Sequence, residues 1–345
     1  MMNQYILTIA IPTYNREKLL KRSLESILQQ NDNRVEILVS DNCSTDGTCS
    51  LMNYYATRYS NIRYIKNDEN IGSNNNFLQC YRKARGKYIM LLGSDDLLLE
   101  GALKEIINFL YNNSVEWTFL NHTGFKGKFC NIDSCNEAFI SDTGNFVTND
   151  RMTFMKYAKY EVTFMSCQII KKDIFNKVKN PEKYAITHFI HTNIAFEGTM
   201  DDSSNFGIIT KCCIAQDQSP MNAGIETDIR NQFIIFGKWM KYTLCDVSSR
   251  YGYKYYDMYK IYIDRLCEYW PQMIITLKAE NRLEWWNTFW EDAFPHIKKS
   301  IKTYIYILPS VMLPKKICKF IVKFIKPIYV KAKYRIKNEK KISSV

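Results

Sequence analysis

Two adjacent aspartates, Asp95 and Asp96, stand at the end of an apolar run. The sequence there reads Lys87-Tyr-Ile-Met-Leu-Leu-Gly-Ser-Asp-Asp-Leu-Leu98, so an expected buried strand runs directly into two carboxylates. Unshielded acids at such a place are costly unless a positive group meets them. At the carboxyl end of a strand in an open α/β sheet, a ligand or a metal ion supplies that group. The pattern therefore indicates an enzyme site; the alternative is that both acids cap the following helix.

Other polar residues follow the neighbouring expected strands. Thr13 and Tyr14 close the first strand, where they offer a hydroxyl and an aromatic face. Asp41 ends the second strand; a carboxylate there accepts hydrogen bonds from a nucleotide base or ribose, or it only orders the following loop. Gly72 allows the backbone to approach a phosphate or sugar closely. The asparagines around Gly72 are either ligand donors or ordinary loop residues: Asn70, Asn74, Asn75 and Asn76.

The elements that must position these residues alternate along the first hundred residues. Short apolar runs predict strands at 5–11, 35–39, 61–65 and 88–92, and helical spacing predicts helices at 16–30, 48–59, 77–84 and 101–111. This alternation predicts an α/β fold with a mainly parallel sheet sandwiched by helices. Residues 115–142 read as irregular, 163–170 and 206–215 as strands, and the aromatic pattern beyond Gln232 as helical.

Composition sets further bounds. A chain of 345 residues holds one large domain, or one domain with a substantial extension. Its eleven cysteines are scattered, form no CxxC pair and follow no recognisable signal peptide, so we expect reduced thiols in the cytoplasm.

The positive charge is concentrated at the C-terminus. From Lys298 onward there are fourteen Lys/Arg and one acid, which gives 14 − 1 = +13 of a total of +12 and leaves −1 for the body. From Leu313 an apolar stripe with helical spacing runs beside lysines, and no uncharged stretch reaches the ~20 residues of a spanning helix. This predicts a basic amphipathic helix on an anionic membrane surface, or else a helix packed on the body. Nucleic acid is not expected as a partner because the aromatic residues are not arranged for base stacking.

Four motifs together carry a family resemblance. Ile9-Ala-Ile-Pro-Thr-Tyr-Asn15, Ile37-Leu-Val-Ser-Asp-Asn-Cys-Ser-Thr-Asp-Gly-Thr48, Asn70-Ile-Gly72 and Gly86-Lys-Tyr-Ile-Met-Leu-Leu-Gly-Ser-Asp-Asp96 resemble the family 2 glycosyltransferases in order and spacing. The resemblance covers residues 5–110, is loose over 111–215 and is absent beyond.

The resemblance implies a GT-A fold and inverting transfer from a nucleotide-activated sugar. It divides the chain into a catalytic domain, 1–215, and a helical extension, 216–345. Within the first, about 1–110 is the nucleotide-sugar half and about 111–215 the acceptor half. The nucleotide-sugar site is then expected to contain Pro12, Thr13, Tyr14, Asn15, Asp41, Asn70, Gly72, Asn76, Ser94 and Asp95.

Two departures from the family pattern concern catalysis. The family's metal motif begins with an acid where this chain has Gly93, so a magnesium or manganese ion would rest on Asp95 and Asp96, with Asp95 the more direct ligand. The family's general base is an aspartate, whereas the matching stretch 185–193 contains only His188 and His191. We predict His191 as the base, with His188 as the alternative; nearby carboxylates are Glu197, Asp201 and Asp202.

These features predict an inverting hexosyl- or N-acetylhexosaminyltransferase that uses a nucleotide-sugar, with UDP the expected nucleotide. The acceptor would be a hydroxyl of a lipid-linked surface polysaccharide or lipooligosaccharide, and the enzyme a cytoplasmic protein peripheral to the inner face of the cell membrane. The alternative is a non-catalytic nucleotide-sugar-binding protein of the same fold. Nucleotidyl transfer is disfavoured because no basic glycine-rich loop follows the first strand.

Overall fold

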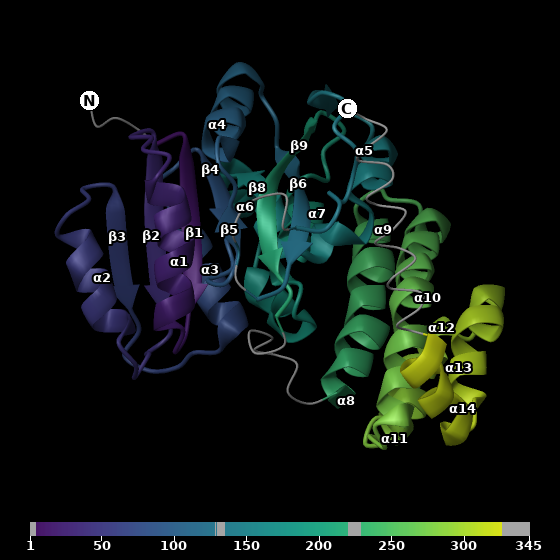
Figure 1. Ribbon diagram of the computed structural model, residues 1–345. Coiled ribbons are helices and arrows are strands. Elements are labelled where there is room, and N and C mark those ends of the chain that lie inside the picture. Colours follow the sequence, from purple (N-terminus) through teal and green to yellow (C-terminus); the bar gives the residue numbers. More distant parts are fainter. Residues whose placement is uncertain (1–4, 128, 130–134, 220–228, 326–345) are drawn as a thin grey trace, which may run out of the picture. The chain divides into compact units, whose positions relative to one another are not determined.

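The computed structural model describes residues 5–127, 129, 135–219 and 229–325. Two compact units are present (Figure 1): unit one comprises 1–224 and 242–255, and unit two comprises 225–241 and 256–345. Unit one thus runs past residue 215 and takes in a helical segment from beyond it. One contact of this segment with the rest of unit one is made by Tyr251, whose hydroxyl lies 3.1 Å from that of Tyr184.

Unit one is built on a mixed sheet. Among the described residues it has nine strands in the order β3-β2-β1-β4-β8-β6-β9-β5, with β7 beside β9. The strands are β1 (Leu7–Thr13), β2 (Val35–Asp41), β3 (Ile62–Lys66), β4 (Tyr88–Leu91), β5 (Leu97–Leu98), β6 (Trp117–Phe125), β7 (Phe146–Thr148), β8 (Gln168–Lys171) and β9 (Phe206–Asp217).

The predicted alternation is confirmed in the first four strands, which are mutually parallel. Helices α1 (Glu17–Leu28), α2 (Thr48–Ala56) and α3 (Ser73–Lys83) connect them, and α4 (Ala102–Asn112) follows the Asp95 loop. Alternate apolar residues such as Ile9 and Ile37 form the core with Leu24 of α1. All four strands end at one edge of the sheet, which therefore gathers the residues that follow them.

The expectation of irregular structure over 115–142 was wrong for its first part. Residues Trp117–Phe125 form β6, a fully buried strand parallel to β9 and antiparallel to β8. The register shifts around Asn121, whose amide donates to the carbonyl oxygens of Ile140 and Thr210 at 2.7 and 2.6 Å. A polar bulge of this kind breaks the apolar alternation by which a strand is recognised in a sequence.

The rest of unit one consists of short helices. They are α5 (Arg151–Ala158), α6 (Lys172–Lys177), α7 (Ile190–Gly198), α9 (Ser248–Arg250), the 3₁₀ segments Lys159–Thr163, Met165–Cys167 and Pro181–Thr187, and the π-helical segment Tyr242–Val247.

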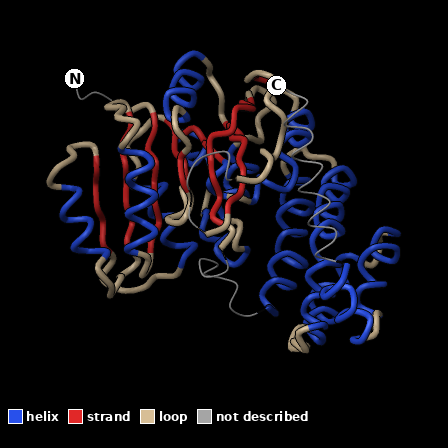
Figure 2. The backbone as a smooth tube through the Cα atoms, viewed as in Figure 1, coloured by secondary structure: helices blue, strands red, loops and turns tan. Residues whose placement is uncertain are grey.

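All the secondary-structure elements described in unit two are helices, drawn in blue in Figure 2, and short loops join them. It contains α8 (Ile229–Gln232), most of α10 (Tyr255–Ala279), α11 (Trp286–Thr288), α12 (Phe294–Ile297), α13 (Leu308–Met312), α14 (Lys315–Phe320) and the π-helical segments Phe233–Trp239, Phe289–Ala293, Thr303–Ile307 and Ile321–Ile325. Stacked aromatic rings, among them Phe233 and Trp285, form its core. No described helix combines the length and hydropathy needed to cross a bilayer.

Candidate active site

The loop after β4 is held by the buried carboxylate of Asp96. One of its oxygens accepts a hydrogen bond from the Ser166 hydroxyl at 2.5 Å, and the other accepts one from the backbone N–H of Asp217 at 3.2 Å. Ser166 in turn accepts a hydrogen bond from the N–H of Gly93 at 2.9 Å. Burial, and then the neighbouring Asp95, raise the pKa of Asp96 well above its usual range. The arrangement does not support the predicted metal contact by Asp96, which instead anchors the loop.

The same packing explains why glycine stands at position 93. A Cβ atom there would lie 2.7 Å from a carboxylate oxygen of Asp96 and 2.9 Å from one of Asp95. Both distances are shorter than van der Waals contact, and an acidic side chain would add like charge. A side chain at this position would therefore force the carboxylates of Asp95 and Asp96 to move.

Asp95 contacts two arginines near α1, one through its carboxylate and the other through its backbone oxygen. Its carboxylate lies 2.7 Å from Nη1 of Arg16, and both side chains keep part of their surface in solvent, 20% and 24%. Arg22 donates to the backbone oxygen of Asp95 at 3.0 Å and to the carboxylate of Asp217 at 2.6 Å. Sequence reasoning missed both arginines, although Arg16 directly follows the Thr13-Tyr14-Asn15 stretch at the same sheet edge.

The residues after β1, β2 and β3 are joined by hydrogen bonds. Asn42 donates its backbone N–H to the Thr13 carbonyl at 2.9 Å and its side-chain amide to Asn70 Oδ1 at 2.7 Å. The N–H of Gly72 donates to the same oxygen of Asn70 at 2.9 Å. Asn15 joins the set because its Oδ1 accepts the N–H of Thr45 at 2.8 Å. The structure thus connects Thr13, Asn70 and Gly72 through Asn42, a residue that the sequence analysis did not single out, and it connects Asn15 to the loop after β2 through Thr45.

Several predicted nucleotide-binding side chains are open to a ligand and others are not. Tyr14 is 44% exposed, and the space beside the α-carbon of Gly72 is empty. The buried Thr13 hydroxyl lacks a hydrogen-bond partner among the described residues. Pro12 and Ser94 are also buried. Gly72 further has a φ of +81°, which favours glycine.

Asp41 and Asn76 are engaged within the protein. Asp41 is fully buried and accepts hydrogen bonds from the Ser44 N–H at 2.9 Å and the Tyr64 hydroxyl at 2.7 Å. Asp41 therefore orders the loop that follows β2, and its contact with the nucleotide base stays a prediction. Asn76 bonds both the hydroxyl and the carbonyl of Ser40, at 2.7 and 2.9 Å, which favours a structural role for this asparagine.

Comparison with known proteins identifies the family. Residues 8–179 match the model described as "Glycosyl transferase family 2". The chain belongs to glycosyl transferase family 2. An uncharacterised glycosyltransferase of Mycoplasma genitalium is 34% identical over 122 residues, which are 34% of this chain and 41% of that protein. The chain thus spans well under two thirds of that relative's length. The Escherichia coli protein WfgD, named a UDP-Glc:alpha-D-GlcNAc-diphosphoundecaprenol beta-1,3-glucosyltransferase, is 21% identical over 73% of this chain and 93% of its own.

Solved structures show the same GT-A fold. Staphylococcus aureus TarS 1–349 in complex with UDP-GlcNAc superposes with a TM-score of 0.59 at 14% identity, covering 85% of this chain and 82% of that one. The mannosyltransferase PcManGT of Pyrobaculum calidifontis, in complex with GDP-Man and Mn²⁺, gives 0.51 at 14% identity, covering 94% and 83%.

The family's metal motif is reduced here to one accessible carboxylate. Asp96 is buried and Gly93 has no side chain, and in the described ranges no cluster of three or more His, Cys, Asp or Glu side chains could hold a metal. Asp95 alone fits a cation whose remaining ligands are diphosphate oxygens and waters. The donor set therefore fits a cation shared with a substrate rather than one caged by the protein.

The two histidines of the family's base region differ in accessibility. His191, in α7, is buried; its Nε2 lies 3.0 Å from the Thr163 carbonyl oxygen, and burial lowers its pKa to about 4. The structure therefore does not support His191 as the base. His188 lies just before α7, is only half-buried and has a φ of +61°. Burial also lowers the pKa of His188, so its imidazole is neutral near pH 7.

The carboxylates considered beside the histidines are paired. Glu197 lies 2.7 Å from the Lys183 ammonium and accepts the Tyr184 hydroxyl at 2.6 Å. Asp201 pairs with Lys177, and Asp202 pairs with Arg151. His188 is thus the better-placed candidate of this segment. The segment is tied to the start of α3, because the Asn74 amide donates to the Ala185 carbonyl.

His191 makes stability depend on pH. Its pKa is about 4 in the fold against 6.5 unfolded, so between these values the unfolded chain binds an extra proton and stability falls as pH falls. His191→Gln, which retains a donor for the Thr163 carbonyl, is expected to gain about 2 kcal/mol relative to the natural protein between about pH 7 and about pH 5. Urea unfolding at both pH values measures this. A constant difference between the two proteins would contradict the buried neutral state.

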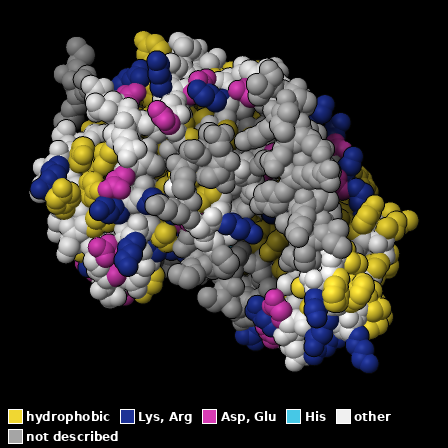
Figure 3. Space-filling model, in the orientation of Figure 1, with side chains coloured by type: hydrophobic (Ala, Val, Ile, Leu, Met, Phe, Trp, Pro, Cys, Tyr) yellow, Lys and Arg dark blue, Asp and Glu magenta, His cyan; other side chains and the backbone are white. Residues whose placement is uncertain are grey.

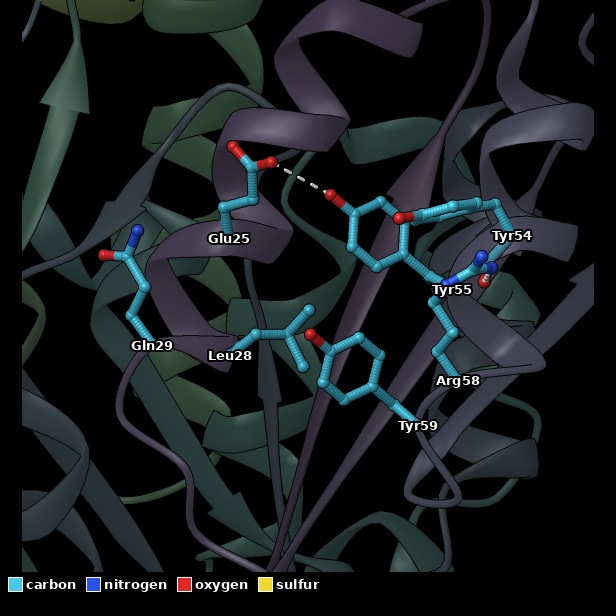
Figure 4. A pocket seen from close by; sticks show the side chains of 7 residues that line it. All are labelled: Glu25, Leu28, Gln29, Tyr54, Tyr55, Arg58 and Tyr59. Carbon is cyan, nitrogen blue, oxygen red and sulfur yellow. Dashed lines mark hydrogen bonds between the residues drawn. The ribbon is translucent and has the colours of Figure 1, made fainter.

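A separate cavity lies between α1 and α2 (Figure 4). It measures about 350 Å³ and is lined by Glu25, Leu28, Gln29, Tyr54, Tyr55, Arg58 and Tyr59. The Tyr55 hydroxyl donates to Glu25 at 3.0 Å, and burial followed by this carboxylate raises the pKa of Tyr55 to about 12. These residues belong to the ends of helices that run away from the Asp95 edge, so the cavity is not part of the candidate active site.

Proposed function

We propose that this protein transfers a sugar, with inversion, from a nucleotide-sugar to a hydroxyl of a glycan acceptor. The observation that carries the proposal is the convergence at one sheet edge. The end of β1 and the loops after β2 and β3 are linked through Asn42, and Arg16 links the start of α1 to Asp95 after β4. This is the edge where open α/β sheets bind nucleotides.

Arg16 and Asp95 would serve the diphosphate of the donor. A divalent cation bound by Asp95 would neutralise charge that develops on the diphosphate as the sugar–phosphate bond breaks. The Arg16 guanidinium, released from Asp95, could then donate to phosphate oxygens. Tyr14 offers an exposed face for stacking, and Asp41 and Thr13 are the proposed contacts to the nucleoside.

His188 is the proposed general base. Its neutral imidazole would take the proton of the acceptor hydroxyl as that oxygen attacks the anomeric carbon and the nucleoside diphosphate leaves. The bond formed is the new glycosidic bond, and the bond broken is the one from the sugar to phosphate.

UDP is the proposed nucleotide, and a hexose or N-acetylhexosamine the proposed sugar. The name of WfgD specifies UDP-Glc and a diphosphoundecaprenol acceptor, and TarS was solved with UDP-GlcNAc. A lipid-linked precursor of a surface polysaccharide or lipooligosaccharide is the proposed acceptor. The enzyme would then work in the cytoplasm, peripheral to the inner face of the cell membrane.

The roles of the two units are also proposals: unit one is catalytic, and unit two is a helical extension that ends in the membrane-associating helix. Of that predicted helix, the structure describes α14 and the π-helical segment to Ile325. Residues 326–345 lie outside the described part.

A screen of nucleotide-sugars by thermal shift, with and without Mn²⁺, tests the proposal. A stabilising donor is then incubated with lipid-linked glycan acceptors, and release of the nucleoside diphosphate is measured. Stabilisation followed by release supports the transferase. Stabilisation without release on any acceptor favours the non-catalytic binding protein, and the absence of stabilisation by every donor overturns both.

A further inference from the structure

The C-terminal part of unit two exposes a concentration of large apolar side chains. Nine of them, each at least 45% exposed, fall within 301–325: Ile301, Tyr304, Ile305, Tyr306, Met312, Ile317, Phe320, Phe324 and Ile325. On the face drawn in Figure 3, hydrophobic side chains gather at the lower right, with Lys and Arg side chains at their border. Soluble monomeric proteins usually expose large apolar side chains singly, whereas contiguous groups of them mark interaction surfaces.

The helical stretch 301–312 is apolar on both sides. Thr303, Ile307 and Val311 are fully buried within unit two, and Lys278 holds this side by donating to the Val311 carbonyl at 2.5 Å. Ile301 and Ile305, one turn apart, are 74% and 57% exposed. A helix that is apolar all round is normally covered by protein or lipid on every side.

The next stretch, 315–325, repeats the pattern with a lysine stripe. Phe320 and Phe324 are exposed, with ring centroids 5.2 Å apart, whereas Cys318 is buried. Lys319 and Lys323 are exposed beside them. Apolar rings beside ammonium groups suit the boundary between lipid headgroups and acyl chains.

Charge identifies the occupant of this surface. From Ile301 to Ile325 the sequence has five lysines and no acid, and one of the five, Lys302, pairs with Asp264 of α10. A second copy of the chain, docked through the same patch, would bring lysines against lysines. Anionic lipid headgroups instead neutralise each ammonium group that approaches them.

We propose that the outward face of 301–312 enters an anionic membrane surface together with 315–325. Membrane contact then begins at Ile301, before the amphipathic helix expected from residue 313 onward. This inference deepens the peripheral membrane association proposed above and assigns it to two adjacent helical stretches. Tyr304 and Tyr306 would lie at headgroup level, where tyrosine is favoured.

Vesicle sedimentation of the full chain tests the proposal. Phosphatidylcholine vesicles with and without phosphatidylglycerol are compared for the natural protein, for Ile301→Asp/Ile305→Asp and for Phe320→Asp/Phe324→Asp. Each double variant is expected to bind anionic vesicles about fivefold or more weakly, since it places charge where apolar surface must insert. The matched control is Tyr111→Asp, a 74% exposed residue of α4 in unit one, which should bind normally.

The outcomes separate this inference from the proposed function. Unchanged binding of the Ile301→Asp/Ile305→Asp variant would overturn the proposal and confine membrane contact to the region beyond residue 312. A natural protein that forms dimers broken by these substitutions, without binding vesicles, would assign the surface to a second copy. Thermal unfolding and donor-induced stabilisation should match the natural protein in both variants. Vesicle binding without sugar transfer would leave this inference intact and refute only the transferase.

Discussion

Asp95→Ala is expected to lower the rate of sugar transfer about a thousandfold. Asp95 is the one carboxylate of the Gly93–Asp96 loop that keeps solvent exposure, and it is the proposed protein ligand of the cation. Its loss would leave the charge that develops on the diphosphate without this neutralisation. Nucleoside diphosphate release with saturating donor and acceptor measures the effect.

The same variant has a readout that does not depend on turnover. Mn²⁺ should increase donor-induced thermal stabilisation of the natural protein, and Asp95→Ala should lose this increase. Asp202→Ala is the matched control, because Asp202 also pairs with an arginine, Arg151, but lies near the end of α7. If Mn²⁺ stabilised the Asp95→Ala complex as strongly as the natural one, Asp95 would not be the ligand.

His188→Asn is expected to lower kcat by a factor of about a hundred to ten thousand, the usual contribution of a general base. Asparagine tolerates the positive φ of 61° at this position, so the backbone should be retained. Donor binding should not change, since the proposed role concerns only the acceptor proton. Steady-state kinetics and donor thermal shift together separate the two effects.

The dependence of kcat on pH gives a second test of His188 as the base. Because burial lowers the pKa of His188, the imidazole loses its proton below its ordinary value of 6.5, and activity should fall only under that pH. The variant should lack this acidic limb. His191→Gln is the matched control and should keep kcat within a few-fold. If His191→Gln lost activity while folded and His188→Asn kept it, the assignment of the base would be reversed.

The sheet edge was largely predictable from sequence. Apolar runs followed by Thr13, Asp41 and Asp95 imply parallel strands, and parallel strands that share helical crossovers end at one edge. The structure confirms this parallel arrangement for the first four strands. The second half of the sheet was harder to predict, because β6 has the polar residues Asn121 and His122 in its middle. In addition, β6 pairs with β9, a strand about ninety residues further along the chain.

The individual roles of side chains at that edge were harder to predict. Asp95 and Asp96 are neighbours in the sequence, yet one is partly exposed and the other buried. Their difference depends on Ser166 and Asp217, which lie 70 and 121 residues beyond Asp96. Likewise, burial and not sequence spacing distinguishes His188 from His191.

Asp96, in the donor half, is held by residues of the second half of the catalytic unit. Its partners come from the 3₁₀ turn Met165–Cys167 and from the last residue of β9. A fragment limited to the first 110 residues would contain every donor-side motif. In that fragment, however, the loop Gly93–Asp96 would lose the hydrogen bonds that Asp96 makes to Ser166 and Asp217. We therefore expect the donor site to form only when the acceptor half is folded. In a chimaera of two relatives, Asp96 and its partners Ser166 and Asp217 should come from the same parent protein.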